Sequence, residues 1–135
     1  QLRAGRTCTD FDPRNMGHLK RIVQRLPNLQ IVVSSSWRCG RTVAELGQLL
    51  ARVVSSEQIF DKTPELLSRS RGEEICQWRM EWGIREHIAP YNIRFAVLDD
   101  DGFDMVAVFD NFFRTDARYG LTRKIADAVV RHLRR

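Results

Sequence analysis

The sequence predicts a layered α/β domain with a mostly parallel sheet. Patterns typical of helices and strands alternate along the chain, in the order helix, strand, helix, strand, helix, strand, strand, helix. Phe95 to Leu98 form a continuous apolar run, which is typical of a strand covered on both faces in a parallel sheet. With 135 residues and a hydrophobic fraction of 43%, we expect one domain with its own core over residues 1–135.

The first half of the chain supplies two helices and two strands. Apolar residues recur at three- and four-residue spacing from Met16 to Leu26, which predicts a helix that begins near Pro13 and ends before Pro27. Leu29 to Val33 is expected to be a strand. Thr42 then predicts a helix start, because Glu45 three residues later completes a capping box, and Ile59 with Phe60 suits a short edge strand.

The second half continues the alternation. Thr63 to Glu65 suggests a short helical turn, and a helix from Glu73 to Trp82 is expected to stop at Gly83. After the strand that ends at Leu98, residues 105–109 suit either a helical turn or a strand. The last elements are a short strand over residues 112–115 and a helix over residues 123–133 that is capped at Thr122.

Three consecutive carboxylates, Asp99, Asp100 and Asp101, follow the apolar strand directly. They repel one another at the end of a buried strand, so a cation or several hydrogen-bond donors should balance them. Mg²⁺ suits this position, because it takes a few carboxylate oxygens and keeps several waters. An ordinary acidic turn closed by Gly102 is the alternative that the pattern leaves open.

The earlier strand also ends in polar residues, the run Ser34-Ser35-Ser36-Trp37-Arg38. Hydroxyl and guanidinium groups suit a phosphate, although three serines also suit a simple loop. Ligands in open α/β sheets bind outside the carboxyl ends of the strands. We therefore expect this phosphate-binding chemistry and the carboxylates after Leu98 to belong to one site.

Composition limits the classes of partner. The net charge of +5 and the pI near 9.6 suit an anionic partner. The densest basic cluster, Arg131, Arg134 and Arg135, is interpreted as the solvated end of a helix. Because the chain shows no membrane-length apolar run, no signal segment and no paired cysteine spacing, we expect a cytoplasmic protein.

Four motifs in order resemble a known family: residues 33–38, residues 71–75, residues 97–101, and Thr115-Asp116 followed by residues 120–122. Together they resemble the haloacid dehalogenase-like (HAD) superfamily. The closest resemblance is to the small HAD domain without a cap that occurs in Swiss-army-knife RNA repair proteins. It extends over residues 11–133, nearly the whole chain.

This resemblance implies a Rossmann-like three-layer sandwich and Mg²⁺-dependent hydrolysis of a phosphomonoester through an aspartyl-phosphate. The substrate would be a small molecule or a nucleic-acid end. Carried over residue by residue, Ser34 or Ser35 would hydrogen-bond the phosphoryl oxygens, and Arg71 would neutralise the nucleophile and the phosphate. Asp99 and Asp100 would hold Mg²⁺.

One element of the family pattern is missing, the first central strand that ends in Asp-x-Asp-Gly and carries the nucleophile. Asp10-Phe11-Asp12 is not its equivalent, because no apolar strand precedes it and Pro13 follows where Gly is expected. We therefore expect an N-terminally truncated domain that is inactive as given. The alternative is a HAD-like module that binds phosphate or nucleic acid without catalysis.

The resemblance also predicts a structural consequence of the missing strand. It places that strand between the strand over residues 29–33 and the strand over residues 95–98. Without it, each of these strands loses a ladder partner unless the two pair with each other.

Overall fold

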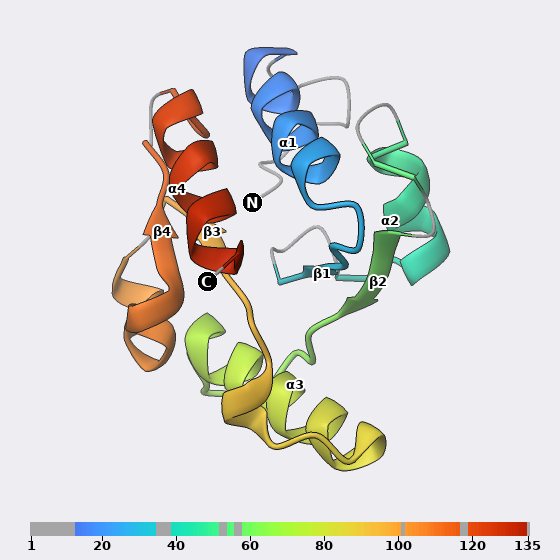
Figure 1. Ribbon diagram of the computed structural model, residues 1–135. Coiled ribbons are helices and arrows are strands. Elements are labelled where there is room, and N and C mark those ends of the chain that lie inside the picture. The colour runs from blue at the N-terminus through green and yellow to red at the C-terminus, as the bar shows by residue number, and fades with distance from the viewer. Residues whose placement is uncertain are drawn as a thin grey trace.

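The computed structural model describes residues 13–34, 39–51, 54–55, 58–100, 102–116 and 119–134. Figure 1 shows how the helices and strands of these residues are arranged. The elements are, in chain order, α1 (Pro13–Arg25), β1 (Ile31–Val33), α2 (Val43–Leu49), β2 (Ile59–Lys62), α3 (Arg71–Glu86), η4 (Pro90–Asn92), β3 (Val97–Asp99), η5 (Phe103–Asn111), β4 (Phe112–Arg114) and α4 (Arg123–Arg134). The predicted alternation of helices and strands is confirmed.

Capping boxes begin two of the helices. At α2, the amide of Glu45 donates to Thr42 Oγ1 at 3.1 Å and the amide of Thr42 donates to Glu45 Oε1 at 2.9 Å, as the sequence predicts. At α3, Ser70 and Glu73 form the same pair of hydrogen bonds, each at 3.1 Å. The second box has the same Ser/Thr-x-x-Glu spacing as the first. It therefore starts α3 at Arg71, two residues before the predicted position.

Two local predictions were wrong. Helix α3 does not stop at Gly83, which is buried inside it. It ends at Glu86, where His87 adopts a left-handed conformation (φ 56°) and the amide of Ile88 donates to the carbonyl of Gly83 at 2.8 Å. Residues 63–65 form no helical turn, because the amide of Thr63 donates to the carbonyl of Val33 at 3.0 Å and so extends the β1–β2 ladder.

The strands form two separate parallel pairs. β1 pairs with β2, and β3 pairs with β4 with Val97 opposite Phe112 and Asp99 opposite Arg114. Within the residues that the structure describes, β1 and β3 do not pair with each other, so each keeps one edge without a neighbouring strand. The architecture is a mixed α/β fold with small parallel sheets, and it is compatible with a HAD-like fold.

The β3–β4 pair is covered by helices on both faces. Leu98 and Phe113 pack against the buried residues of α1 and α4, whereas Val97 and Phe112 pack against α3 and η5. Alternate residues of each strand point to opposite faces, which explains why two consecutive apolar residues of each strand both contact helices. Strand β3 begins at Val97, two residues later than predicted, and the expected cover on both faces is confirmed for Val97 and Leu98.

A second part of the core lies between α1, α2 and the β1–β2 pair. Its buried residues come from all four elements and from the segment that follows α2: Val23, Val33, Leu46, Leu50, Val54 and Ile59. Helix α1 belongs to both parts of the core, because Val23 faces α2 while its neighbour Ile22 packs against α4. The two strand pairs are therefore connected through α1.

A groove of about 390 Å³ lies between the two strand pairs. Gln30 and Val32 line it from β1 and its approach, Arg94 and Phe95 line it from the approach to β3, and α3 contributes two tryptophans. Among the described residues, no helix is long and apolar enough to cross a membrane.

Candidate functional site

The centre of the candidate site is an ion pair between Arg71 and Asp99. Nη1 of Arg71 donates a hydrogen bond to Oδ2 of Asp99. Arg71 is the first residue of α3, behind the Ser70 cap, and Asp99 is the last residue of β3. The side chains are only 20% and 11% exposed, so their attraction is screened less than it would be on the surface. The family resemblance assigned functional roles to both residues, and the structure places them in contact.

Asp104 supports Arg71 from the other side. Its Oδ1 accepts a hydrogen bond from the backbone amide of Arg71 at 3.2 Å, and its Oδ2 lies 3.8 Å from Nε of Arg71. The amide of Arg71 belongs to the first turn of α3, where the helix dipole is positive. A negatively charged carboxylate is therefore favourable there. Arg71 is thus held between Asp99 and Asp104, which fixes the direction of its guanidinium group.

The sequence analysis missed Asp104. The signal available was a fourth carboxylate shortly after Asp101 and Gly102, immediately before the segment whose secondary structure was ambiguous. That segment is the 3-10 helix η5, with non-helical backbone angles at Met105 and Val108. The 3-10 helix has no clear apolar periodicity of its own, so its packing against α3 could only be seen in the tertiary structure.

Gly72 permits the close approach of α3 and η5. A Cβ atom at this position would lie 3.0 Å from the carbonyl oxygen of Asp104 and 3.3 Å from Cα of Met105. Met105 is completely buried beneath this contact. Because a side chain would push the two elements apart, Gly72 is what allows Asp104 to reach Arg71.

The backbone continues the ladder beyond β3 and β4. The amide of Thr115 donates to the carbonyl of Asp99 at 2.8 Å, and Nε of Arg114 donates to the carbonyl of Asp100 at 3.2 Å. These hydrogen bonds hold the backbone of Asp99 and Asp100 in place. The residue Asp100 itself is exposed. Arg114, which the sequence analysis treated only as part of a strand, adds a second guanidinium beside the acidic turn.

The predicted phosphate-binding serines are described only in part. Ser34 follows β1 directly and is half-buried, while Ser35 lies outside the described residues, as does Asp101. Ser34 follows a strand of the β1–β2 pair, and Asp99 ends a strand of the β3–β4 pair. The meeting of these two strand ends at one phosphate therefore stays a prediction.

The donor set at the end of β3 suits Mg²⁺ by its chemistry. Asp99 and Asp100 offer carboxylate oxygens, and Mg²⁺ is commonly held by one or two carboxylates together with waters and substrate phosphate. Across the described parts of the chain, no group of three or more His, Cys, Asp or Glu side chains is placed to hold a metal ion. These residues would thus bind Mg²⁺ together with water and phosphate, and not as a closed protein cage.

Comparison with protein families decides the identity of the domain. The family described as the HAD domain in Swiss Army Knife RNA repair proteins matches residues 1–126. The chain belongs to this family. No curated protein and no solved structure matches it.

Membership of the HAD family confirms the resemblance that the four motifs indicated. It suggests a phosphohydrolase-like module, and HAD domains generally use Mg²⁺. In this HAD domain, Arg71 and Asp99 belong to two of the four motifs and are in direct contact. The contact brings two of the four motifs together, and the position of the serines relative to them stays a prediction.

Proposed function

We propose that this HAD domain is the phosphate- and Mg²⁺-binding part of a phosphohydrolase that acts on a phosphomonoester. The observation that carries the proposal is the contact between Arg71 and Asp99 at the carboxyl end of β3. A cation and a carboxylate held together in this position suit a bound phosphate and its metal ion. Phosphoryl transfer depends mostly on positioning and on neutralising charge.

Arg71 would contact the phosphoryl oxygens of the substrate. Its guanidinium has five N–H donors, so it can hold Asp99 and Asp104 and still donate to a phosphate. Asp104 is a positioning residue in this scheme, because it touches Arg71 and acts through it. Ser34 or Ser35 would donate a hydroxyl hydrogen bond to another phosphoryl oxygen.

Asp99 and Asp100 would hold Mg²⁺. When bound, the ion neutralises the negative charge of the phosphoryl group and orients it. In its absence, Arg71 balances the charge of Asp99, so the buried end of β3 never carries an uncompensated carboxylate. The exposed position of Asp100 leaves room for water around the ion.

The nucleophile is the part of the reaction that these 135 residues do not supply, because no apolar strand pattern that ends in Asp-x-Asp-Gly precedes the first helix, where the family resemblance places the nucleophile. We therefore propose that the chain as given binds phosphate and Mg²⁺ without turnover, and that the complete gene product catalyses hydrolysis. A nucleic-acid end is a suitable substrate class, since a domain without a cap leaves its site open to large molecules.

The test uses the complete gene product. Release of inorganic phosphate from p-nitrophenyl phosphate and from 5′- and 3′-phosphorylated oligonucleotides is measured with Mg²⁺ and with EDTA. We expect Mg²⁺-dependent release that Asp99→Asn abolishes. Asp110→Asn removes an exposed carboxylate of η5 and should leave the rate unchanged. Absence of Mg²⁺-dependent release from all of these substrates would contradict the proposal.

A non-catalytic module that binds phosphate or nucleic acid is the second candidate. The absence of an apolar strand that ends in Asp-x-Asp-Gly before the first helix favours it. It predicts that the complete gene product binds phosphorylated oligonucleotides more tightly than unphosphorylated ones and releases no phosphate. Arg71→Gln should remove this preference, because Arg71 is the proposed phosphate contact.

A further inference from the structure

The positive charge of the protein is concentrated on two helices. The basic residues of α1 and α4 are Arg14, Lys20, Arg21, Arg25, Arg123, Lys124, Arg131 and Arg134. The two helices contain a single acidic residue, Asp127. Their net charge is therefore +7, whereas the whole chain has a net charge of only +5. The rest of the protein is slightly acidic.

The two helices lie side by side, as Figure 1 shows. Near the middle of α4, Nε of Arg21 donates to Oδ1 of Asp127 at 3.0 Å. Near its end, Nη2 of Arg134 donates to the carbonyl of Arg25 at 3.0 Å. These bonds bring basic residues from the two helices together on one surface.

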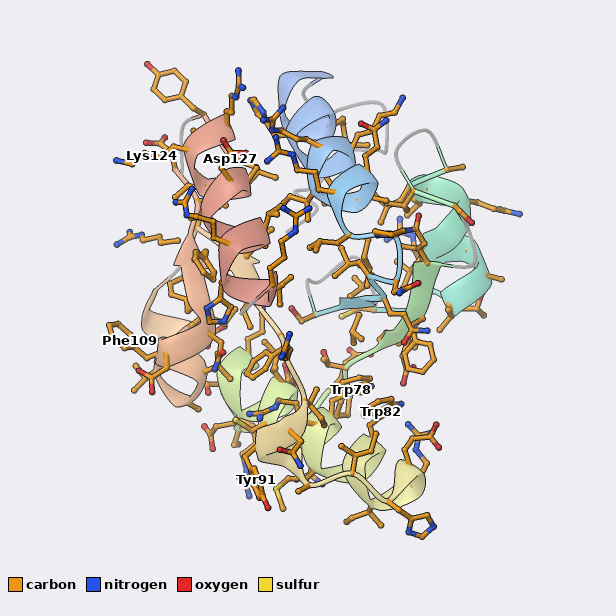
Figure 2. All side chains as sticks on the ribbon, viewed as in Figure 1. Trp78, Trp82, Tyr91, Phe109, Lys124 and Asp127 are labelled. Atoms are coloured by element: carbon orange, nitrogen blue, oxygen red, sulfur yellow. The ribbon has the colours of Figure 1, made fainter. Side chains whose placement is uncertain are left out.

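We name this surface the basic seam. It comprises one acidic and six basic residues: Arg21, Arg25, Arg123, Lys124, Asp127, Arg131 and Arg134. Figure 2 shows Asp127 on the side of α4 near α1, whereas Lys124 points away from the molecule. Lys124 and Arg131 are exposed and lie on the same side of α4, seven residues apart.

Asp127 cannot neutralise the seam. Three arginines surround it: its nearest oxygens lie 3.0 Å from Arg21, 3.6 Å from Arg25 and 3.9 Å from Arg123. The hydrogen bond from Arg21, with the charges of the surrounding arginines, holds the pKa of Asp127 below its ordinary value, so Asp127 is ionised at neutral pH. A net positive charge still remains, and like charges so close together repel. An anion bound along the seam would relieve this repulsion.

The dimensions and chemistry of the seam favour one kind of anion. Arg123 and Arg134 lie at opposite ends of α4, about 16 Å apart along the helix axis, which is the axial rise of about five nucleotides in a duplex strand. Neither helix contains Phe, Tyr or Trp on which a base could stack. Their apolar faces are buried in the core, so neither helix has an apolar side left to enter a membrane.

We propose that the basic seam binds the phosphodiester backbone of a nucleic acid, without selecting its base sequence. Binding of this kind releases counterions and weakens steeply as salt rises. It does not depend on hydrolysis at Asp99, because a phosphodiester backbone carries charge with or without a terminal phosphate.

The test is binding of the 135-residue chain to a fluorescein-labelled RNA that has hydroxyl groups at both ends, followed by fluorescence anisotropy. Salt is varied from about 50 to 200 mM, the range in which backbone binding changes most. The triple variant Arg25→Gln, Lys124→Gln and Arg131→Gln lowers the charge of the seam and leaves the bond between Arg21 and Asp127 in place. We expect roughly tenfold weaker binding and a salt slope that is smaller by about 2.

The matched control removes three exposed arginines that do not belong to the seam: Arg69→Gln, Arg85→Gln and Arg94→Gln. Both triple variants change the net charge equally, so a local seam predicts a much smaller loss for the control. Circular dichroism of each variant checks that it is folded. Equal losses in the two folded variants would overturn the proposal. No binding by the unchanged chain at low salt, or binding only to anionic phospholipid vesicles, would also overturn it.

If phosphate release fails while the unphosphorylated RNA still binds through the seam, the proposed hydrolysis is wrong. The proposed RNA binding by the seam is then supported. If phosphate release succeeds while the seam variant binds RNA as tightly as the unchanged chain does, the proposed RNA binding by the seam is wrong. The proposed hydrolysis is then supported. The two outcomes can therefore be separated, because the RNA probe has no terminal phosphomonoester for the site at Asp99.

Discussion

Arg71 and Asp99 join two elements that the chain itself separates by 28 positions. The first residue of α3 donates a hydrogen bond from its guanidinium to the carboxylate at the end of β3. Both side chains are mostly buried, so each compensates a charge that would be costly alone. The pair therefore has a structural role even before any phosphate binds.

Replacing Arg71 by Gln should destabilise the fold. The substitution leaves Asp99 mostly buried without its guanidinium partner, and we expect a loss of about 2 kcal/mol in the free energy of unfolding. Urea unfolding measures it. The double variant with Asp99→Asn should lose less than the sum of the single variants, because the two residues interact directly.

The matched control is Arg69→Gln, at an arginine close to Arg71 in sequence. Arg69 forms an ion pair with Glu73 at 3.3 Å, but its side chain is 61% exposed. Surface pairs of this spacing contribute only about 0.3–0.5 kcal/mol. Equal destabilisation by the two substitutions would show that Arg71 and Asp99 behave as an ordinary surface pair.

Gly72→Ala should destabilise the protein, although alanine favours helices. The added Cβ would lie 3.0 Å from the carbonyl of Asp104, and this backbone cannot move without shifting η5. Overpacking of this kind costs about 1–3 kcal/mol, which outweighs a gain in helix propensity of about 1 kcal/mol. Thermal unfolding measures the effect.

Gly17→Ala in α1 is the corresponding control. Apart from the backbone of α1 itself, none of the described atoms lies within 4 Å of a Cβ built at this position, and Gly17 is exposed. We expect stabilisation by about 0.5–1 kcal/mol from helix propensity alone. If Gly72→Ala also stabilises the protein, the contact between α3 and η5 is looser than the structure shows.

The two capping boxes predict a loss of stability in acid. Hydrogen bonds from the backbone of Ser70 and of Thr42 hold the pKa values of Glu73 and Glu45 below their ordinary value of 4.5. A carboxyl whose pKa is lower in the folded state stabilises the fold fully above its unfolded pKa. That contribution is lost as pH falls below 4.5 and through the folded pKa values.

The measurement is the urea midpoint as a function of pH. The variant with Glu45→Gln and Glu73→Gln keeps side chains of similar shape that do not titrate. Its midpoint should fall less steeply in acid than that of the unchanged chain. Identical curves for both proteins would show that the capping glutamates contribute nothing to the pH dependence.

Trp78 and Trp82 offer a matched comparison on α3. Their rings are stacked with centroids 5.8 Å apart, and each ring contacts the ring of Phe60 edge to face. Nε1 of Trp78 also donates to Oδ2 of Asp61 at 2.7 Å. Trp78→Phe and Trp82→Phe remove similar ring area, but only the first removes this bond to a carboxylate.

We therefore expect Trp78→Phe to cost about 1.5–3 kcal/mol more than Trp82→Phe if the bond to Asp61 stabilises the fold. Urea unfolding followed by circular dichroism gives both values. A larger loss for Trp82→Phe would contradict this expectation and would assign the main role to ring packing.

Much of the local structure could be predicted from the sequence, because its causes are local. The capping box of Thr42 and Glu45 starts α2 where the spacing indicates. The apolar spacing from Met16 to Leu26 predicts α1, which ends at Arg25 before Pro27. The end of α3 could not be predicted in this way. Gly83 is a common helix stop in sequence, but here it is buried within the helix and His87 provides the left-handed residue instead.

The candidate site was predictable in its residue types but not in its contacts. Arg71 and Asp99 were selected by family resemblance, and no spacing along the chain shows that they touch. Asp104 and Arg114 were missed because their partners, the amide of Arg71 and the carbonyl of Asp100, are distant in sequence. Ser34 and Ser35 remain predictions, since Ser35 lies outside the described residues.

The sequence by itself determined the alternation of helices and strands, the helix starts at hydrogen-bonding caps, and the carboxylates at the end of an apolar strand. Each of these depends on side chains within a few residues of one another. Only the tertiary structure decided that Arg71 lies between Asp99 and Asp104, that β1 and β3 do not pair among the described residues, and that the basic faces of α1 and α4 meet. These relationships depend on packing between distant segments, where burial and shape decide which charges come into contact.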